Sequence, residues 1–362
     1  MRIALIGGIY GTDGASRKKL QVTPETLLEH GLLGRGHSVT TFGHYAPIDA
    51  KQFDLVHVHH LSYGAIRLAT DNTDVPFLYT SHAGAAMSKS ETSLARQIAA
   101  RFVMSRVDAL VALSRAEADF QERSYPLAGA LHVVISNGVD PTNFTYARDN
   151  DAGRHRSWQL LYVGQLIALK KVDVLLRALA KLEQPTELTL VYQNAALEVP
   201  LQKLAEELGL SERVHFLGFR PPRELVTLYH RADVLVLPSA AEALPSVVTE
   251  AMFCGTPVIA TNVGGVREQL GGYGVCIPPE RPDELVAAIS HVIDHYERLA
   301  AQSEAASVYA RERFSIKNMV DRHLELYTNL LRRNGPRRRH TPLCIPVNAV
   351  MQVGVGLICA TK

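Results

Sequence analysis

Two glutamates eight positions apart, Glu242 and Glu250, are the side chains whose type and spacing first indicate chemistry. On one continuous helix they would be rotated roughly 80° from each other. Pro245 lies between them, so we expect one acid in a loop and the other on a new helix. Both carboxylates could then point at a single ligand. The alternative is a solvated Glu242 and a Glu250 that pairs locally.

The helix that carries Glu250 is predicted to begin with Ser246 as its N-cap, to run over residues 247–254 and to end at Gly255. Its first turn would offer the free N–H groups of Ser246, Val247 and Val248. Together with the helix dipole, these groups favour a phosphate. We therefore expect an anionic ligand over the start of this helix.

Short apolar runs flank this helix on both sides. Residues 234–237 and 258–261 are each predicted to form a buried parallel strand, and Gly264 and Gly265 form a turn after the second. The order is strand, loop, helix, strand, which is the repeating unit of an open parallel sheet. Ligands of such sheets bind at the carboxyl ends of the strands.

The segment 233–265 resembles the donor-site segment of the retaining GT-B glycosyltransferases of family 4, the glycosyl transferases group 1. That family has the form PS..E..P..V.EAM..G.PVIA...GG, which this chain reproduces nearly intact, and the resemblance covers roughly residues 1–331. It implies an α/β GT-B fold, with two Rossmann-like doubly wound parallel-sheet domains facing a cleft. It also implies a UDP- or GDP-linked sugar donor, retention at the anomeric carbon, and neither metal nor cofactor.

The same resemblance implies roles for individual residues. Glu242 would contact the donor sugar, Glu250 the ribose, and Lys170 of the segment KKVD the diphosphate; His82, at the end of TSH, would reach the sugar. Further donor-binding positions are Gly164, Gln165, Lys171, Gly218, Arg220, Ala243, Leu244, Ser246, Val247, Val248, Gly8 and Gly14.

Three positions depart from the family pattern. Gln165 stands where the family has arginine, Lys171 where it has glycine, and Lys19-Leu20 where it has a glycine pair. Loss of the arginine would weaken diphosphate stabilisation by about 1–3 kcal/mol unless Lys171 substitutes for it. Binding of the donor is therefore a firmer expectation than turnover.

His57, His59 and His60 lie close together in the sequence, and clustered histidines can bind a metal. No carboxylate or cysteine completes a ligand set there at a usable sequence spacing, so these histidines are interpreted as strand or turn residues. The Asp149-Asn150-Asp151 triplet has the form of a metal-binding D-x-D. No strand precedes it, and it is interpreted as a solvated linker. We predict no metal.

The expected organisation is an N-terminal, acceptor-side domain over residues 1–140, a linker over 141–158 and a donor-binding domain over 159–313. A final helix over 314–331 would cross back to the first domain, and residues 332–362 would be a disordered extension. The four cysteines show no framework spacing, which indicates a reducing cytoplasm.

Charge separates the chain into a nearly neutral body and a basic end. Residues 332–362 hold six basic residues and no acid, which leaves 32 basic and 36 acidic residues in the rest. Nucleic-acid binding by the body is therefore not expected. Arg96, Arg101 and Arg106 on a predicted helix leave open a peripheral contact with the inner face of the membrane.

Three alternatives to transfer onto a sugar, lipid-linked or small-molecule acceptor stay open. A GT-B-fold sugar-nucleotide 2-epimerase shares the architecture, and a sucrose- or phosphate-dependent relative would use the same donor site. A non-catalytic sugar-nucleotide binding protein would bind the nucleotide and consume no donor. Pocket shape, and not fold, decides between sugars and acceptors.

Overall fold

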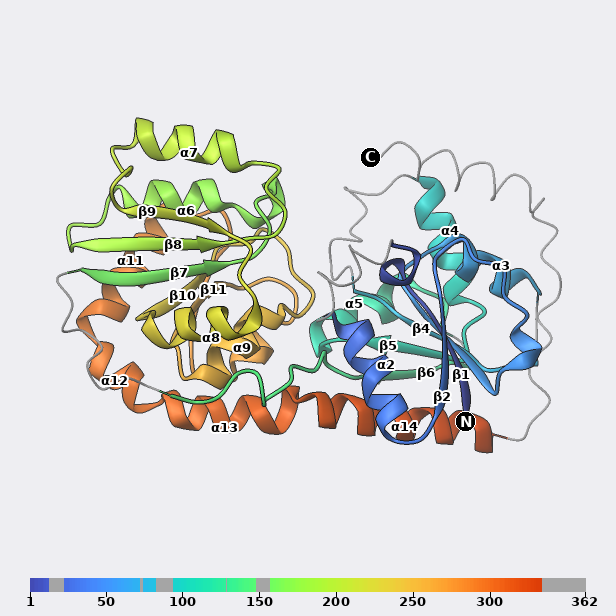
Figure 1. Cartoon of the computed structure of the whole chain (residues 1–362). Coiled ribbons are helices and arrows are strands. Elements are labelled where there is room, and N and C mark those ends of the chain that lie inside the picture. The colour runs from blue at the N-terminus through green and yellow to red at the C-terminus, as the bar shows by residue number, and fades with distance from the viewer. Residues whose placement is uncertain (13–22, 72–73, 83–93, 128, 148–156, 334–362) are drawn as a thin grey trace. The chain divides into compact units, whose positions relative to one another are not determined.

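The structure is a computed structural model of the whole chain, and it describes residues 1–12, 23–71, 74–82, 94–127, 129–147 and 157–333. The chain forms two compact units. The first comprises Met1–Gly138 together with the C-terminal segment from Ile316, and the second comprises Val139–Ser315. Both are α/β units built on a six-stranded sheet (Figure 1).

All strands of the first sheet run parallel, in the order β2-β1-β3-β4-β5-β6. Their bounds are β1 Arg2–Ile6, β2 Ser38–Phe42, β3 Leu55–His59, β4 Phe77–Thr80, β5 Ala109–Ala112 and β6 Leu131–Val134. The strand order reverses between β1 and β3. In open α/β sheets, such a switch point opens a crevice at the carboxyl ends of the strands.

Helices cover both faces of this sheet because alternate side chains of each strand point to opposite faces. Ile3 and Leu5 of β1 belong to one apolar cluster, and Ala4 and Ile6 to another. The helices are α2 Pro24–Gly34, α3 Tyr63–Asp71, α4 Leu94–Met104, α5 Arg115–Ser124 and α14 Ile316–Arg332, with short 3-10 turns η1 Gly8–Gly11 and η2 Ala50–Gln52.

The last described helix, α14, packs on α2 in the first unit. The two helices approach so closely at Gly31 that a Cβ atom there would lie 2.3 Å from Cγ2 of Val320. Tyr327 is fully buried and forms a 2.8 Å hydrogen bond with Nδ1 of His57 on β3. Residues far apart in the sequence therefore share one core.

The second sheet is also parallel and has the order β12-β11-β10-β7-β8-β9. Its strands are β7 Trp158–Val163, β8 Thr186–Val191, β9 Val214–Gly218, β10 Val234–Leu237, β11 Val258–Thr261 and β12 Val275–Ile277. Numbered from β7, this is the doubly wound order 3-2-1-4-5-6, with the switch point between β7 and β10.

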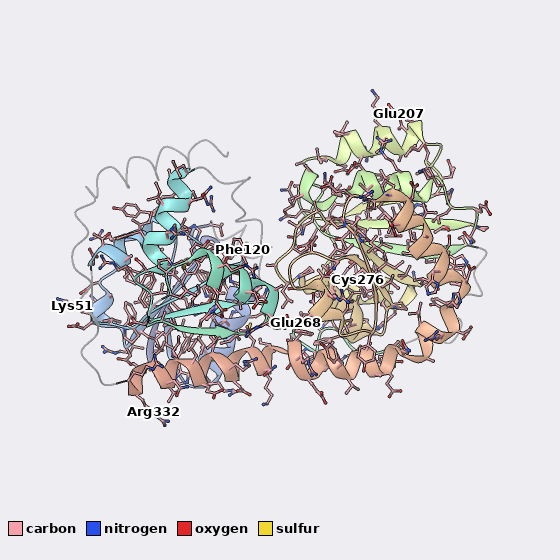
Figure 2. All side chains as sticks on the ribbon, turned by 180° about the vertical axis from the view of Figure 1, so that it is seen from behind. Lys51, Phe120, Glu207, Glu268, Cys276 and Arg332 are labelled. Carbon is pink, nitrogen blue, oxygen red and sulfur yellow. The ribbon has the colours of Figure 1, made fainter. Side chains whose placement is uncertain are left out.

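Helices again cover both faces of the second sheet, and the side chains fill the space between the layers (Figures 1 and 2). They are η4 Ala168–Lys170, α6 Val172–Leu179, α7 Glu198–Glu207, α8 Pro222–Arg231, α9 Ser246–Cys254, α10 Val266–Leu270, α11 Pro282–Asp294, α12 Tyr296–Ala301 and α13 Ser303–Phe314. Among the described residues, no helix is both long enough and apolar enough to cross a membrane.

The predicted α/β class with two parallel-sheet units is confirmed. The last helix, expected to begin at Phe314, begins at Ile316, because Ser315 is extended and bridges Val139 while α13 ends at Phe314. The linker triplet Asp149–Asp151 and the tail from residue 334 lie outside the described residues.

Candidate active site

Lys170 and Glu242 meet at the switch point of the second sheet. Lys170 follows β7 and Glu242 follows β10, and these two strands are neighbours. Nζ of Lys170 lies 2.6 Å from Oε1 of Glu242, and the hydroxyl of Ser239 donates to the same oxygen at 2.6 Å. Both charged side chains are largely buried, with 18% and 9% exposure. The fold therefore brings these two predicted site residues together.

The glycine turn after β11 supports the loop that carries Glu242. A Cβ atom on Gly264 would lie 1.9 Å from the carbonyl oxygen of Glu242, and its φ of +53° is one that favours glycine. The next amide, of Gly265, donates to the carbonyl of Ala243 at 2.8 Å. Glycine is needed at position 264 because the two backbones touch here.

The start of α9 differs by one residue from the prediction. Pro245, in extended conformation, is the N-cap, and Ser246 is the first helical residue, so Ser246 makes no side-chain cap. The amide of Val248 was expected to be free, but it donates to the carbonyl of Pro245 at 3.1 Å. Among the described residues, the amides of Ser246 and Val247 have no assigned acceptor. The helix thus offers two amides to an anion, and not three.

Glu250 lies one turn further along α9 and is half-buried. Its Oε2 accepts a 2.8 Å hydrogen bond from the hydroxyl of Tyr229 on α8. Burial raises the pKa of Glu250 to about 7, and the Tyr229 hydrogen bond opposes this shift only in part. Near neutral pH the side chain can therefore either accept or donate a hydrogen bond.

Sequence reasoning missed three supporting residues, Tyr229, Ser239 and Gln269. The amide of Gln269 on α10 donates to the carbonyl of Pro245 at 2.9 Å and to Thr249 at 2.7 Å, which fixes the start of α9. Ser239 was visible as part of the segment PSAAE, but nothing in its spacing indicated a bond to a carboxylate. Tyr229 is an ordinary core residue by its helical position.

Lys171 has a left-handed backbone, with φ +50° and ψ +40°, which explains why the family has glycine at this place. Its ammonium group lies 3.0 Å from Oε2 of Glu280. Gln165 is exposed, and its main-chain carbonyl accepts a 2.8 Å hydrogen bond from the hydroxyl of Tyr162. Gly164 sits so close to this tyrosine that a Cβ atom would lie 2.6 Å from the hydroxyl.

The remaining predicted positions are spread over both units. Gly218 has a φ of +64° at the end of β9, and Arg220 lies within 3.5 Å of Glu224 on the next helix. Leu244 is buried in the Glu242 loop. Gly8 faces the ring of His44 in the first unit. Two predicted features, Gly14 and the Lys19-Leu20 departure, lie outside the described residues.

His82 lies just beyond β4 in the first unit, among other histidines. Its Nε2 is 2.9 Å from Nδ1 of His59, the last residue of β3. Glu25, in the first turn of α2, accepts from His60 at 3.1 Å and belongs to the same cluster. Sequence spacing offered no carboxylate to these histidines, but Glu25, from a different element, lies beside His59 and His82 in the structure. Sequence distance hid this contact.

Two parts of the chain match family models. Residues 147–309 match the model described as glycosyl transferases group 1, and residues 27–143 match glycosyltransferase family 4. A curated relative, D-inositol 3-phosphate glycosyltransferase of Corynebacterium urealyticum, is 31% identical over 80% of this chain and 74% of the relative. The chain belongs to the glycosyl transferases group 1. The D-inositol 3-phosphate glycosyltransferase of Rhodococcus opacus is 33% identical over 76% of this chain and 67% of its own length.

Solved structures show that this glycosyltransferase has the GT-B fold. Sucrose-phosphate synthase from Thermosynechococcus elongatus superposes with a TM-score of 0.78 at 21% identity, covering 91% of this chain and 99% of that one. Anabaena HepE in complex with UDP superposes with a TM-score of 0.74 at 22% identity, covering 91% and 100%. The predicted family, fold class and enzyme class are thereby confirmed.

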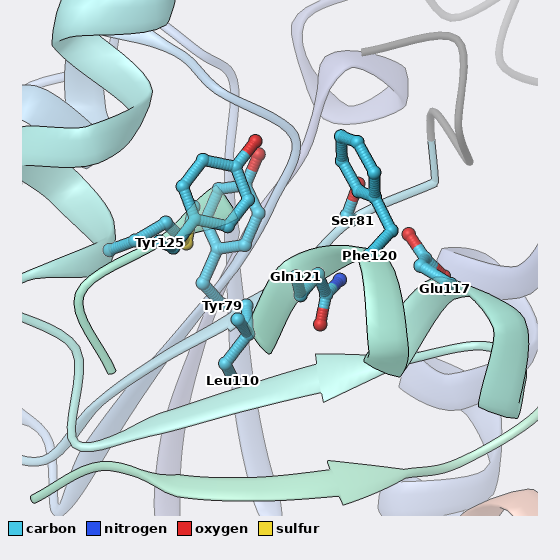
Figure 3. A pocket seen from close by; sticks show the side chains of 8 residues that line it. Tyr79, Ser81, Leu110, Glu117, Phe120, Gln121 and Tyr125 are labelled. Atoms are coloured by element: carbon cyan, nitrogen blue, oxygen red, sulfur yellow. The ribbon is translucent and has the colours of Figure 1, made fainter. Parts of the chain in front are cut away.

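The glycosyltransferase has one cavity in its first unit and another in its second unit. The one in the first unit is lined by Tyr79, Ser81, Glu117 and Tyr125 among others, and its volume of about 10 Å³ has room for at most one water (Figure 3). The other, of about 610 Å³, lies in the second unit around β12, where Figure 2 labels Cys276. The smaller one is too small to hold a sugar.

Proposed function

We propose that this glycosyltransferase moves a hexosyl group from a nucleotide-diphosphate sugar to a sugar, lipid-linked or small-molecule acceptor, with retention and without a metal. The observation that carries the proposal is the Lys170–Glu242 ion pair. It lies at a sheet switch point, on the loop that leads into α9. A cation, two amides and two carboxylates in one such place suit a sugar joined to a diphosphate.

Each residue has a distinct part in this proposal. Lys170 and the amides of Ser246 and Val247 would stabilise the negative charge that grows on the leaving diphosphate. Lys170 would then exchange its bond to Glu242 for a bond to phosphate, which frees that carboxylate for the sugar. Glu250 would accept from the ribose hydroxyls in place of Tyr229.

The names of relatives support a UDP-linked donor and a polyol acceptor. The curated relatives are called D-inositol 3-phosphate glycosyltransferases, and the Anabaena protein is seen in complex with UDP-glucose. We therefore propose UDP-hexoses as the first donors to examine, GDP-hexoses as the second, and a phosphorylated polyol as the first acceptor. His82 keeps its proposed role toward the donor sugar.

We also propose a cytoplasmic location, where nucleotide sugars and reduced thiols are available. Peripheral membrane contact has less support. Two of the three arginines that suggested it bind within the first unit, since Arg101 donates to the carbonyl of Ser124 at 2.7 Å and Arg106 lies over the ring of Phe102.

The test is a transfer assay with UDP- and GDP-hexoses, each with inositol 3-phosphate, with free and phosphorylated hexoses, or with no acceptor. We expect nucleotide release that depends on the acceptor and persists in EDTA. Proton NMR should show a product with the anomeric configuration of the donor. Lys170→Met should lower the rate at least 100-fold, because an uncompensated diphosphate is a poor leaving group.

Other results would support the alternatives. Conversion of the donor sugar without acceptor would indicate an epimerase, and turnover only with sucrose or inorganic phosphate would indicate a relative that uses those substrates. Binding of nucleotide with no turnover would indicate a non-catalytic binding protein, a reading that Gln165 in place of arginine favours. Inverted product would contradict retention.

A further inference from the structure

A cluster of two histidines and one glutamate in the first unit has the composition of a metal site. One ligand atom from each of Glu25, His59 and His82 lies within 4.8 Å of the others. Glu25 and His59 are buried, and His82 is half-buried. Glu25 lies on α2, His59 ends β3, and His82 lies two residues beyond β4, so three separate segments near the β1/β3 switch point bring the ligand atoms together.

The positions of the ligand atoms follow from the sheet. Strands β3 and β4 are neighbours in register, with His59 opposite Thr80, so His82 lies just beyond the end of β4 at the same edge. Helix α2 begins above this edge through a capping box at Thr23, which places Glu25 in its first turn. His60 has a left-handed φ of +70° and directs Nε2 onto Glu25. Such strain often marks a functional position.

Hydrogen bonding within the protein leaves the cluster incomplete. Nε2 of His59 is buried and has no hydrogen-bond partner among the described residues. Its other nitrogen, Nδ1, faces Nε2 of His82 at 2.9 Å, where the two rings can share only one proton. The nearby His57 differs, because Tyr327 and Thr80 satisfy both of its nitrogens at 2.8 and 2.7 Å. His59 therefore has a nitrogen that is available to a ligand, whereas His57 has none.

The residue types suit a cation, because a neutral imidazole nitrogen and a carboxylate oxygen each offer a lone pair to a metal ion. Two neutral imidazoles and one carboxylate are the donor set of several catalytic zinc sites.

We propose that Glu25, His59 and His82 bind a divalent transition-metal ion such as Zn²⁺, and that the bound ion inhibits transfer by occupying His82. The nitrogen and carboxylate donors favour zinc over Mg²⁺, which takes oxygen ligands. Binding would break the hydrogen bond between His59 and His82, because a nitrogen bound to the ion holds no proton, and each neutral ring would keep its proton on its other nitrogen. The inhibitory half of the proposal rests on the proposed function, in which His82 reaches the donor sugar. The binding half does not.

The experiment is a zinc titration of the full chain by calorimetry and thermal denaturation, with Mg²⁺ as the matched ion and EDTA as the metal-free reference. We expect saturable zinc binding and a raised melting temperature, and no response to Mg²⁺. Glu25→Gln and His59→Asn should each weaken zinc binding at least roughly 10-fold. Cooperative melting in EDTA checks that both variants are folded.

A control variant separates this cluster from surface histidines. His291 on α11 and His295, the C-cap residue of that helix, are exposed and stacked with ring centroids 4.3 Å apart, and they could bind zinc by themselves. The double variant His291→Asn/His295→Asn should keep the tight zinc site. If the wild-type chain shows no zinc-specific response, or if Glu25→Gln and His59→Asn bind zinc as the wild type does, the metal site is refuted.

The transfer assay decides the inhibitory half. Zinc at 10 times its measured dissociation constant should inhibit wild-type transfer about 10-fold, and EDTA should reverse the inhibition. Each ligand variant, compared with its own zinc-free rate, should lose this sensitivity. Zinc that binds without changing the rate would overturn inhibition alone. A wild-type chain that binds zinc and transfers no sugar would refute the proposed function and leave the metal site supported.

Discussion

At Glu250, burial favours the protonated side chain, whereas the proposed role requires a carboxylate that accepts hydrogen bonds from the ribose. The side chain is half-buried and accepts a hydrogen bond from Tyr229, and burial raises its pKa to about 7. An acid whose pKa is higher in the folded protein than in the unfolded chain makes its full contribution to stability below the ordinary pKa of 4.5. That contribution is lost as the pH rises through the pKa of the folded protein.

The first prediction is therefore a pH-dependent difference between wild type and Glu250→Gln. As the pH rises from about 4.5 to 7, the wild-type free energy of unfolding should fall relative to the variant by at most about 1.4 kcal/mol for each pH unit. Urea denaturation of both proteins across this range measures it. Parallel profiles would show that Glu250 has an ordinary pKa.

Lys171 supplies the second prediction. A left-handed lysine costs roughly 1 kcal/mol relative to glycine, whereas its exposed pairing with Glu280 contributes little. Lys171→Gly should therefore be about 1 kcal/mol more stable than Lys171→Ala, since both lose the pairing and only alanine keeps the strain. Equal midpoints in urea would contradict the left-handed conformation.

At the scale of elements, the turn after β11 and the Glu242 loop act as one unit. Gly264→Ala places a methyl group against the Glu242 carbonyl, so we expect a loss of about 1–3 kcal/mol in stability together with the loss of most transfer. Gly272→Ala is the matched control, because its φ of +92° is strained but nothing lies within 4 Å of the added atom. Equal effects of the two changes would contradict the role given to close packing.

The contact between α2 and α14 gives a prediction for a pair of residues. Gly31→Ala should destabilise the chain because its methyl group would overlap Val320, and Val320→Ala should relieve that overlap. In a double-mutant cycle, the two changes should couple favourably by about 1 kcal/mol or more. Additive losses would show that the helices can separate at no cost.

The elements themselves were largely predictable from the sequence. Strands such as Val234–Leu237 and Val258–Thr261 were bounded correctly, because each is a short apolar run next to a proline. The start of α2, with Thr23 as N-cap and Pro24 as its first residue, has the composition typical of a helix start. The one-residue error at Ser246 arose because a serine after proline has the composition of a cap whether or not it caps.

Contacts between distant segments could not be predicted in this way. The family resemblance assigned Lys170 and Glu242 to one donor site, but nothing in the sequence predicted their ion pair, since 72 residues separate them. The approach of Glu25 to His59 and His82 was missed, because no local pattern encodes where a helix begins above a sheet. Sequence periodicity reports which face of an element is buried, but not which residues meet there.

For the whole molecule, the central claim is that the second unit binds a nucleoside diphosphate without a metal. Thermal denaturation with UDP, GDP and ADP, each with and without EDTA, tests it most directly. A nucleotide at about 100 times its dissociation constant should stabilise the fold by roughly 2.7 kcal/mol. The account predicts a raised melting temperature with UDP that EDTA leaves unchanged and that Lys170→Met abolishes. No response to any nucleotide, or one that EDTA removes, would contradict it.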